Sequence, residues 1–242
     1  MRYIISDIHG CYEEYQELLD KIRFSDEDEL YILGDAMDRG PEPIKVIKDI
    51  MMRPNVIYIV GNHDYMMLSA LRKLAVEITE ENCENHLASK DLLNYYYWVQ
   101  DGGRVTADQF RALSHEEQQG ILDYLSDTLI YETLEEKDKQ FVLVHAGIQR
   151  FEEHRDLDEY DIYDFIFGRT DYSKRYYQDY RKIVVTGHTP TPFIREDGQP
   201  LIYRGNGHIA VDCGCVFGGN LAAYCIENEE TVYVRNKQRL GT

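Results

Sequence analysis

The sequence predicts an α/β fold in which two mixed β-sheets pack together and are flanked by helices (αββα). In the first 64 residues, apolar β-type runs recur at the spacing of about 30 residues that is typical of a βαβ unit, which indicates parallel strands. After residue 127, short apolar runs separated by Gly and Asn turns indicate a mostly antiparallel second half. We expect residues 1–242 to form a single domain, because α/β folds of this length are often one domain.

The first half predicts three strands that alternate with three helices. The strands are expected at 3–5, 30–33 and 56–60, and the helices over 11–23, 41–52 and 63–76. Pro41 and Pro43 suit the first turn of the second helix, where a missing N–H costs nothing. Pro54 predicts that this helix has ended before the third strand begins.

Residues 80–127 differ from their surroundings and predict a helical insertion within the domain. The stretch is polar with a helical period, and Ser114 with Glu117 forms a capping box for a helix over 115–125. Strand patterns then return at 128–131, 141–144, 183–185, 201–203, 208–211, 221–226 and 231–234.

Composition excludes several classes of partner. The net charge is −18, from 44 acidic and 26 basic residues, so we expect no nucleic-acid partner, since binding phosphate backbones needs clustered Lys and Arg. No stretch approaches the roughly 18 apolar residues of a membrane span, and no membrane partner is expected. The first expected site residue is already Asp7, which argues against a signal peptide. We therefore expect a cytoplasmic protein; the sequence specifies no oligomeric state.

Three polar clusters directly follow the three expected strands of the first half. They are Asp7-Ile8-His9-Gly10, Gly34-Asp35-Ala36-Met37-Asp38-Arg39-Gly40 and Gly61-Asn62-His63-Asp64. The carboxyl ends of parallel strands meet at one edge of a sheet, where ligand sites of open α/β sheets form. We therefore expect these clusters to lie close together.

Two later histidines, His145 and His188, also follow apolar runs and lie within two residues of a glycine. Oxygen and imidazole ligands without sulfur are typical of a hard or borderline divalent metal site. Asp7, His9, Asp35, Asn62, His145 and His188 would fit two metal ions about 3.5–4 Å apart, with Asp35 bridging them. We expect Mn first, with Fe or Zn as alternatives.

These clusters resemble the phosphoprotein phosphatase branch of the calcineurin-like metallophosphoesterases. The pattern of that branch is Asp-x-His, Gly-Asp-x-x-Asp-Arg-Gly, Gly-Asn-His-(Glu or Asp) and two further histidines. The small bacterial and phage protein serine/threonine phosphatases are the nearer group. The segments that are similar to theirs are Trp98–Gly103 with Thr106, Gly187–Pro190 and Asp212–Gly219.

The resemblance implies a role for each site residue. One metal is held by Asp7, His9 and Asp35, and the second by Asp35, Asn62, His145 and His188. Arg39 and Arg169 bind the phosphate, and His63 forms a pair with Asp38. Asp64 and Asp101 depart from the Glu and Asn usual at their positions, and neither is expected to touch a metal ligand.

Phosphoester hydrolysis explains why these residue types occur together. Two divalent ions would cancel the charge of a phosphate monoester and lower the pKa of a bridging water, giving a hydroxide for direct in-line attack. The planar fork of an arginine suits the equatorial phosphate oxygens. His63 would act as the general acid for the leaving group, with Asp38 fixing its tautomer.

Several functions remain open at this stage. The leading hypothesis is a protein serine/threonine phosphatase acting on a phosphorylated protein. The alternatives are a nucleotide hydrolase resembling the symmetrical diadenosine tetraphosphatases and a phosphatase for another small phosphoester. A non-catalytic scaffold is a remote alternative, because it would be expected to have lost ligands that this chain retains.

Overall fold

The computed structural model describes residues 1–72 and 89–237 and contains two five-stranded sheets. The first sheet has the order β10-β9-β1-β2-β3. Its strands are β1 (Arg2–Ile5), β2 (Glu29–Ile32), β3 (Val56–Tyr58), β9 (Asn220–Cys225) and β10 (Thr231–Arg235). β1, β2 and β3 run parallel, as the βαβ spacing predicts, and β9 pairs antiparallel with both β1 and β10.

The second sheet has the order β4-β5-β6-β8-β7 and is also mixed. Its strands are β4 (Tyr131–Glu136), β5 (Lys139–Val144), β6 (Lys182–Thr186), β7 (Tyr203–Gly205) and β8 (His208–Ala210). β5, β6 and β8 run parallel, while β4 and β7 pair antiparallel at the two edges. The predicted pair of mixed sheets is confirmed.

Buried side chains form three layers of core, which shows how the sheets and helices stack. Successive residues of a strand face opposite sides, so Ile4 lies between the two sheets whereas Ile5 packs under the helices of the first sheet. Phe141 and Val185 of the second sheet join Ile4 in the central layer. Val184 faces the outer layer instead. This alternation produces the predicted αββα arrangement.

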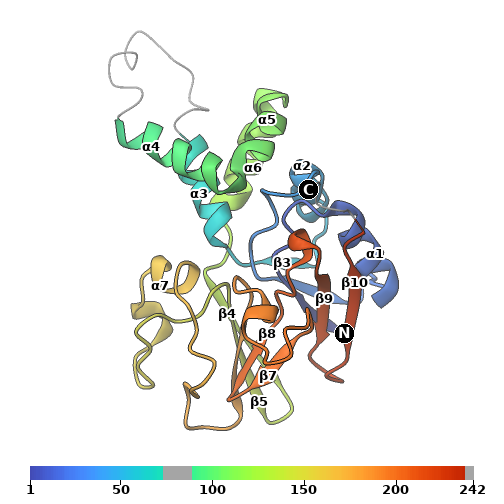
Figure 1. The fold of residues 1–242 in the computed structure, drawn as a ribbon, viewed down its shortest axis with the longest axis vertical. Helices are drawn as coiled ribbons and strands as arrows, with labels where there is room; N and C mark the ends of the chain where they lie inside the picture. The colour runs from blue at the N-terminus through green and yellow to red at the C-terminus, as the bar shows by residue number, and fades with distance from the viewer. Residues whose placement is uncertain (73–88, 238–242) are drawn as a thin grey trace.

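The helices cover the outer faces and one end of the molecule (Figure 1). Their bounds are α1 (Tyr12–Ile22), α2 (Pro43–Met51), α3 (Asn62–Leu71), α4 (Ser89–Trp98), α5 (Arg104–Arg111), α6 (His115–Ser126) and α7 (Ile162–Ile166). A π-helical turn, η1 (Val99–Gly103), joins α4 to α5. Short 3-10 turns lie at η2 (Leu157–Glu159), η3 (Thr191–Phe193) and η4 (Cys215–Phe217).

The expected helical insertion is present over its described part. α4, α5 and α6 stand together at one end of the molecule and contact α3 and α2 (Figure 1). The Ser114 side chain accepts the Glu117 N–H, and the Glu117 carboxylate accepts the Ser114 N–H, which confirms the capping box at the start of α6.

Two predicted elements differ from the structure. The strand expected over 128–131 does not form as one element: Leu129 pairs with the end of β3 in the first sheet, and β4 of the second sheet begins only at Tyr131. The chain changes sheets here, so the apolar run is divided between them. The helix expected over 63–76 begins at Asn62 and continues to Leu71; its predicted end lies outside the described residues. No helix in the described part of the chain is long and apolar enough to cross a membrane.

Candidate metal centre

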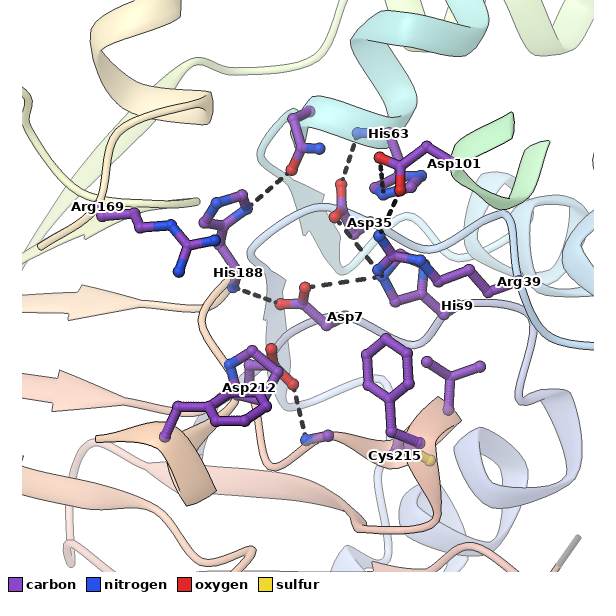
Figure 2. A pocket seen from close by; sticks show the side chains of 16 residues that line it. Asp7, His9, Asp35, Arg39, His63, Asp101, Arg169, His188, Asp212 and Cys215 are labelled. Carbon is purple, nitrogen blue, oxygen red and sulfur yellow. Dashed lines mark hydrogen bonds and ion pairs between the residues drawn. The ribbon is translucent and has the colours of Figure 1, made fainter. Parts of the chain in front are cut away.

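A polar cavity of about 320 Å³ lies where the carboxyl ends of strands from both sheets meet (Figure 2). The predicted site residues that line it are Asp7, His9, Asp35, Arg39, Asn62, His63, Arg169 and His188. His145 is buried and contacts the same group through Asn62, Asp35 and His188. The structure therefore brings together side chains that lie up to 181 positions apart in the sequence.

Asp35 occupies the middle of this group. Its carboxylate belongs to two clusters of closely spaced metal-binding atoms, one with His9 and His63 and the other with His145 and His188. Asp35 Oδ2 lies 3.7 Å from His9 Nε2 and 3.5 Å from His145 Nε2. Its other oxygen accepts the backbone N–H of His63 at 2.9 Å. This position between two clusters is the one that a bridging ligand requires.

Asp7 lies beside the first cluster and, like His9, follows β1. Asp7 Oδ1 lies 3.9 Å from His9 Nε2, and Asp7 Oδ2 accepts the backbone N–H of His188 at 2.8 Å. His9 Nδ1 donates to the Met37 carbonyl at 2.7 Å. Such a hydrogen bond from one ring nitrogen fixes the orientation of a metal-binding histidine and leaves its other nitrogen for the metal.

The second cluster comes from both sheets. Asn62 Oδ1 lies 2.9 Å from His145 Nε2 and 2.9 Å from His188 Nδ1, and the two ring nitrogens are 3.2 Å apart. His145 Nδ1 is 2.6 Å from the Leu33 carbonyl, which fixes this ring in the same way as His9. Asn62 follows β3, whereas the histidines follow β5 and β6.

The protonation of these groups suits cation binding. Burial lowers the pKa values of His9, His145 and His188, that of His188 to about 3, with neighbouring histidines adding to the effect at His9 and His188. Neutral imidazole is the form that coordinates metals. Burial, followed by the charges of Asp7 and Asp64, raises the pKa of Asp35 well above its usual value. A nearby cation would stabilise the ionised form. The donor set therefore fits divalent metal ions.

Several residues at the centre have a positive φ, a backbone conformation that residues other than glycine rarely adopt. Asp7, His9, Asp35, Asp38 and Arg39 have φ values of 50°, 44°, 54°, 69° and 63°. His188 is similar, at 62°. Such residues cost of order 1–3 kcal/mol each and persist where surrounding structure enforces them, commonly at functional sites.

Arg39 has a contact that the sequence did not predict. Its guanidinium Nη1 lies 2.7 Å from His9 Nε2, the nitrogen expected to bind a metal, and its plane lies over the Phe217 ring. A metal ion on His9 Nε2 would exclude this hydrogen bond. The Arg39 guanidinium, which already lines the cavity, would then be free to contact a phosphate.

His63 and Asp38 form the predicted pair. His63 Nδ1 lies 2.8 Å from Asp38 Oδ2, and both side chains are buried. Asp38 also accepts from Trp98 Nε1 at 2.7 Å and from Thr106 Oγ1 at 2.6 Å. The opposite ring nitrogen, His63 Nε2, has no hydrogen-bond partner among the described residues, and His63 lines the cavity.

The remaining predicted residues lie around this centre. Arg169 stands beside His188 at the edge of the cavity (Figure 2). Asp101 lies on η1 opposite, with its carboxylate oxygens 3.5 Å from both His63 Nε2 and Arg39 Nη2. The expectation that Asp64 touches no metal ligand is wrong, because Asp64 Oδ2 accepts the Asp35 backbone N–H at 2.9 Å.

Three features were missed by sequence reasoning. The Trp98 and Thr106 side chains donate hydrogen bonds to Asp38, whereas in the sequence they are identified only by their resemblance to a phosphatase segment. Asp212 lines the cavity, and burial followed by the Asp7 charge raises its pKa well above the usual value. Its position directly after the apolar run at 208–211 was the available signal, since the other site carboxylates also follow strands.

Comparison with known proteins places this geometry in a family. Residues 3–192 match the family model described as calcineurin-like phosphoesterase. The chain belongs to that family. The asymmetrical bis(5′-nucleosyl)-tetraphosphatase PrpE of Oceanobacillus iheyensis is 29% identical, over 97% of this chain and 92% of that protein. The symmetrical bis(5′-nucleosyl)-tetraphosphatase of Buchnera aphidicola is 34% identical, but over 46% of this chain and 41% of that protein.

Two solved structures superpose on this chain over most of its length. A protein provisionally described as a diadenosine tetraphosphatase superposes with a TM-score of 0.65 at 20% identity, over 97% of this chain and 92% of its own. A protein serine/threonine phosphatase from Saccharomyces cerevisiae reaches 0.57 at 9% identity, over 100% and 81%. At these identities the superpositions show the fold alone. The chain is thus a hydrolase of the metallophosphoesterase family.

Proposed function

We propose that this protein hydrolyses dinucleoside polyphosphates at a centre of two divalent metal ions, with Mn as the first expectation. The observation that carries the substrate class is the similarity to the PrpE tetraphosphatases along nearly the whole chain, at 29% identity for the Oceanobacillus iheyensis protein and 28% for that of a Geobacillus strain. The comparisons thus favour the nucleotide-hydrolase alternative over the protein serine/threonine phosphatase that the sequence motifs placed first, although the relatives that match nearly the whole chain carry the asymmetrical and not the symmetrical name.

The metals would be held by the residues that the geometry groups around Asp35. Asp7, His9 and Asp35 would hold one ion, and Asp35, Asn62, His145 and His188 the other. When bound, two such ions neutralise phosphoryl oxygens and make a water molecule acidic enough to serve as the nucleophile at neutral pH.

The chain's own residues then supply binding and proton transfer. Arg39, once released from His9, can present its fork to two phosphoryl oxygens, and Arg169 reaches the same cavity from the opposite side. Asp38 holds the His63 ring through Nδ1, so that Nε2 faces the cavity and can carry a proton to the departing oxygen. Trp98 and Thr106 keep the Asp38 carboxylate in place.

Hydrolysis of diadenosine tetraphosphate tests this proposal and also identifies the bond that is cut. Central cleavage gives two nucleoside diphosphates, whereas off-centre cleavage gives a monophosphate and a triphosphate. Because the relatives that match nearly the whole chain carry the asymmetrical name, we expect AMP and ATP from the purified Mn-loaded protein. Chromatography of the products from a single incubation separates these outcomes.

A phosphoserine peptide and 4-nitrophenyl phosphate should be assayed in parallel at the same metal concentration. A kcat/KM for the phosphopeptide above that for diadenosine tetraphosphate would overturn the proposed substrate and return the protein phosphatase hypothesis to first place. The absence of activity on all three compounds would support the non-catalytic scaffold instead.

A further inference from the structure

A second cavity adjoins the candidate metal centre and shares one arginine with it. It has a volume of about 460 Å³ and lies between the loop 148–153 after β5 and the segment 169–176 before β6. Arg169 lines both cavities. Small-molecule sites have volumes of about 300–1,000 Å³, so this space is large enough for part of a nucleotide.

The charge of this cavity is opposite to that of the whole chain. The protein carries a net charge of −18, yet the cavity is lined by more cationic than anionic side chains. The cations are Arg150, Arg169, Lys174 and Arg175, and the anions are Glu153 and Asp171. A positive site on an acidic protein attracts an anion locally that the rest of the surface repels.

Two of these cations form no ion pair with a carboxylate in the described part of the chain. Within residues 1–72 and 89–237, Arg169 makes no hydrogen bond or ion pair. The Arg175 guanidinium lies over the Tyr180 ring, and its buried Nη1 has no hydrogen-bond partner in the described part of the chain. Arg169 can therefore meet a phosphate oxygen directly, and Arg175 adds positive charge to the wall of the cavity.

The other two cations form ion pairs of different kinds. Lys174 pairs with Asp171 at 2.8 Å and both side chains are exposed, so a polyanion can compete for Lys174 at little cost in free energy. Arg150 pairs at 2.7 Å with the buried Asp164 carboxylate, and breaking that pair would leave a buried charge without its partner.

We propose that this basic cavity binds phosphate groups of the substrate other than the one being hydrolysed, with Arg169 contacting the polyphosphate where it leaves the metal centre. The inference deepens the proposed function and rests on it. A phosphate monoester has no second phosphate and would gain nothing from the cavity. A chain of four phosphates places further negative charge beside the bond that is cut, which the arginine forks can bind in bidentate fashion.

Reversing the charge of Lys174, an exposed residue that lines the cavity, tests this proposal. Lys174→Glu should lower kcat/KM for diadenosine tetraphosphate about tenfold more than for 4-nitrophenyl phosphate, at one saturating concentration of free Mn. Arg175→Gln should shift the same ratio in the same direction, with the melting temperature measured as a check on folding. Lys137→Glu is the matched control: Lys137 is 73% exposed, lies in the β4–β5 turn at the end of β5 away from His145, and should leave the ratio unchanged.

The outcomes separate this inference from the proposed function. If the wild-type protein does not hydrolyse diadenosine tetraphosphate, the proposed function fails and the cavity assignment falls with it. If the wild type does hydrolyse it but Lys174→Glu and Lys137→Glu change the ratio equally, only the cavity assignment is overturned. An equal loss with a phosphoserine peptide would also overturn it, because the cavity would then attract any acidic ligand.

Discussion

The two ring nitrogens of His63 have different surroundings, and this difference defines its expected role. Nδ1 is held by the buried Asp38 carboxylate at 2.8 Å, while Nε2 faces the cavity without a hydrogen-bond partner among the described residues. Asp101 approaches Nε2 to 3.5 Å from the cavity rim. In the proposed function, Nε2 would carry the proton for the leaving group. A ring nitrogen of His63 also lies close enough to His9 and Asp35 to be a metal ligand, so the two roles need to be separated.

His63→Asn should separate these roles. As a general acid, His63 should matter most for substrates that expel a basic alkoxide, so kcat for an alkyl phosphate should fall by about 10²–10⁴. The loss with 4-nitrophenyl phosphate should be much smaller, because nitrophenolate leaves without a proton. The variant should retain its metals by elemental analysis. Equal losses on both substrates, or a missing metal, would assign His63 to the metal centre.

Gly187 shows how closely the backbone packs at the centre. A Cβ atom at this position would overlap the Ser6 hydroxyl and the Asp7 carboxylate, and the next residue, His188, donates its backbone N–H to Asp7. Gly187→Ala should therefore displace Asp7, lowering both metal content and melting temperature.

Gly120→Ala provides the control for that variant. Gly120 lies in the middle of α6, where a Cβ would meet nothing closer than Met51 at 4.0 Å, so alanine should stabilise the helix by about 0.5–1 kcal/mol. Thermal denaturation of both variants measures the effect. A Gly187→Ala protein with normal stability and metal content would show that the packing around Asp7 is looser than the structure indicates.

At the level of single residues, the sequence predicted those that follow strands and missed those that act from a distance. Asp7, Asp35 and Asn62 were predictable because parallel strands deliver their carboxyl ends to one edge. The Trp98 and Thr106 contacts to Asp38 were not, since they span 60 and 68 positions and depend on how helices pack. Periodicity describes one element and contains no information about such packing.

The helical insertion is linked directly to the candidate centre. Its α4 ends at Trp98, and η1 then carries Asp101 to the rim and Gly102 over Arg39, whose backbone N–H donates to the Gly102 carbonyl at 3.0 Å. Gly102 has a φ of 103°, and a Cβ there would approach the Arg39 side chain to 2.6 Å. The turn between α4 and α5 thus contacts Arg39, and the helices on either side of it contact Asp38 through Trp98 and Thr106.

Trp98→Phe should lower catalytic activity by removing a hydrogen bond to Asp38, although Trp98 is not expected to contact the substrate. The change keeps a large aromatic ring in the core but removes the Nε1 donor to Asp38. We expect kcat to fall about 10- to 100-fold, the range typical of supporting hydrogen bonds in metal sites. Metal content should not change. Steady-state kinetics test this, and a normal kcat would show that Thr106 and His63 alone hold Asp38.

Element boundaries were predicted less well than the elements themselves. The run at 128–131 has strand composition, and its β-type residues do pair, but with different sheets. The sequence pattern identifies residues that favour extended backbone and cannot specify where a strand transfers from one sheet to another. The capping box of α6 was predictable because its hydrogen bonds are local, between Ser114 and Glu117.

Across the whole molecule, the candidate centre joins the two sheets. Asp7, Asp35 and Asn62 follow strands of the first sheet, while His145 and His188 follow strands of the second. The five residues meet because both sheets direct the carboxyl ends of parallel strands to the same end of the central core layer. The family resemblance predicted this set from motifs, but only the packing of the sheets explains why Asp35 faces both clusters.

Metal content tests most directly whether Asp35 holds two metal ions together. Purified wild-type protein and Asp35→Asn should be dialysed against the same Mn solution and analysed for bound metal per chain. We expect two ions in the wild type and at most one in the variant, because the amide loses the charge and the second ligand oxygen that a bridge requires. Equal metal content in the two proteins, or a single ion in the wild type, would contradict the account.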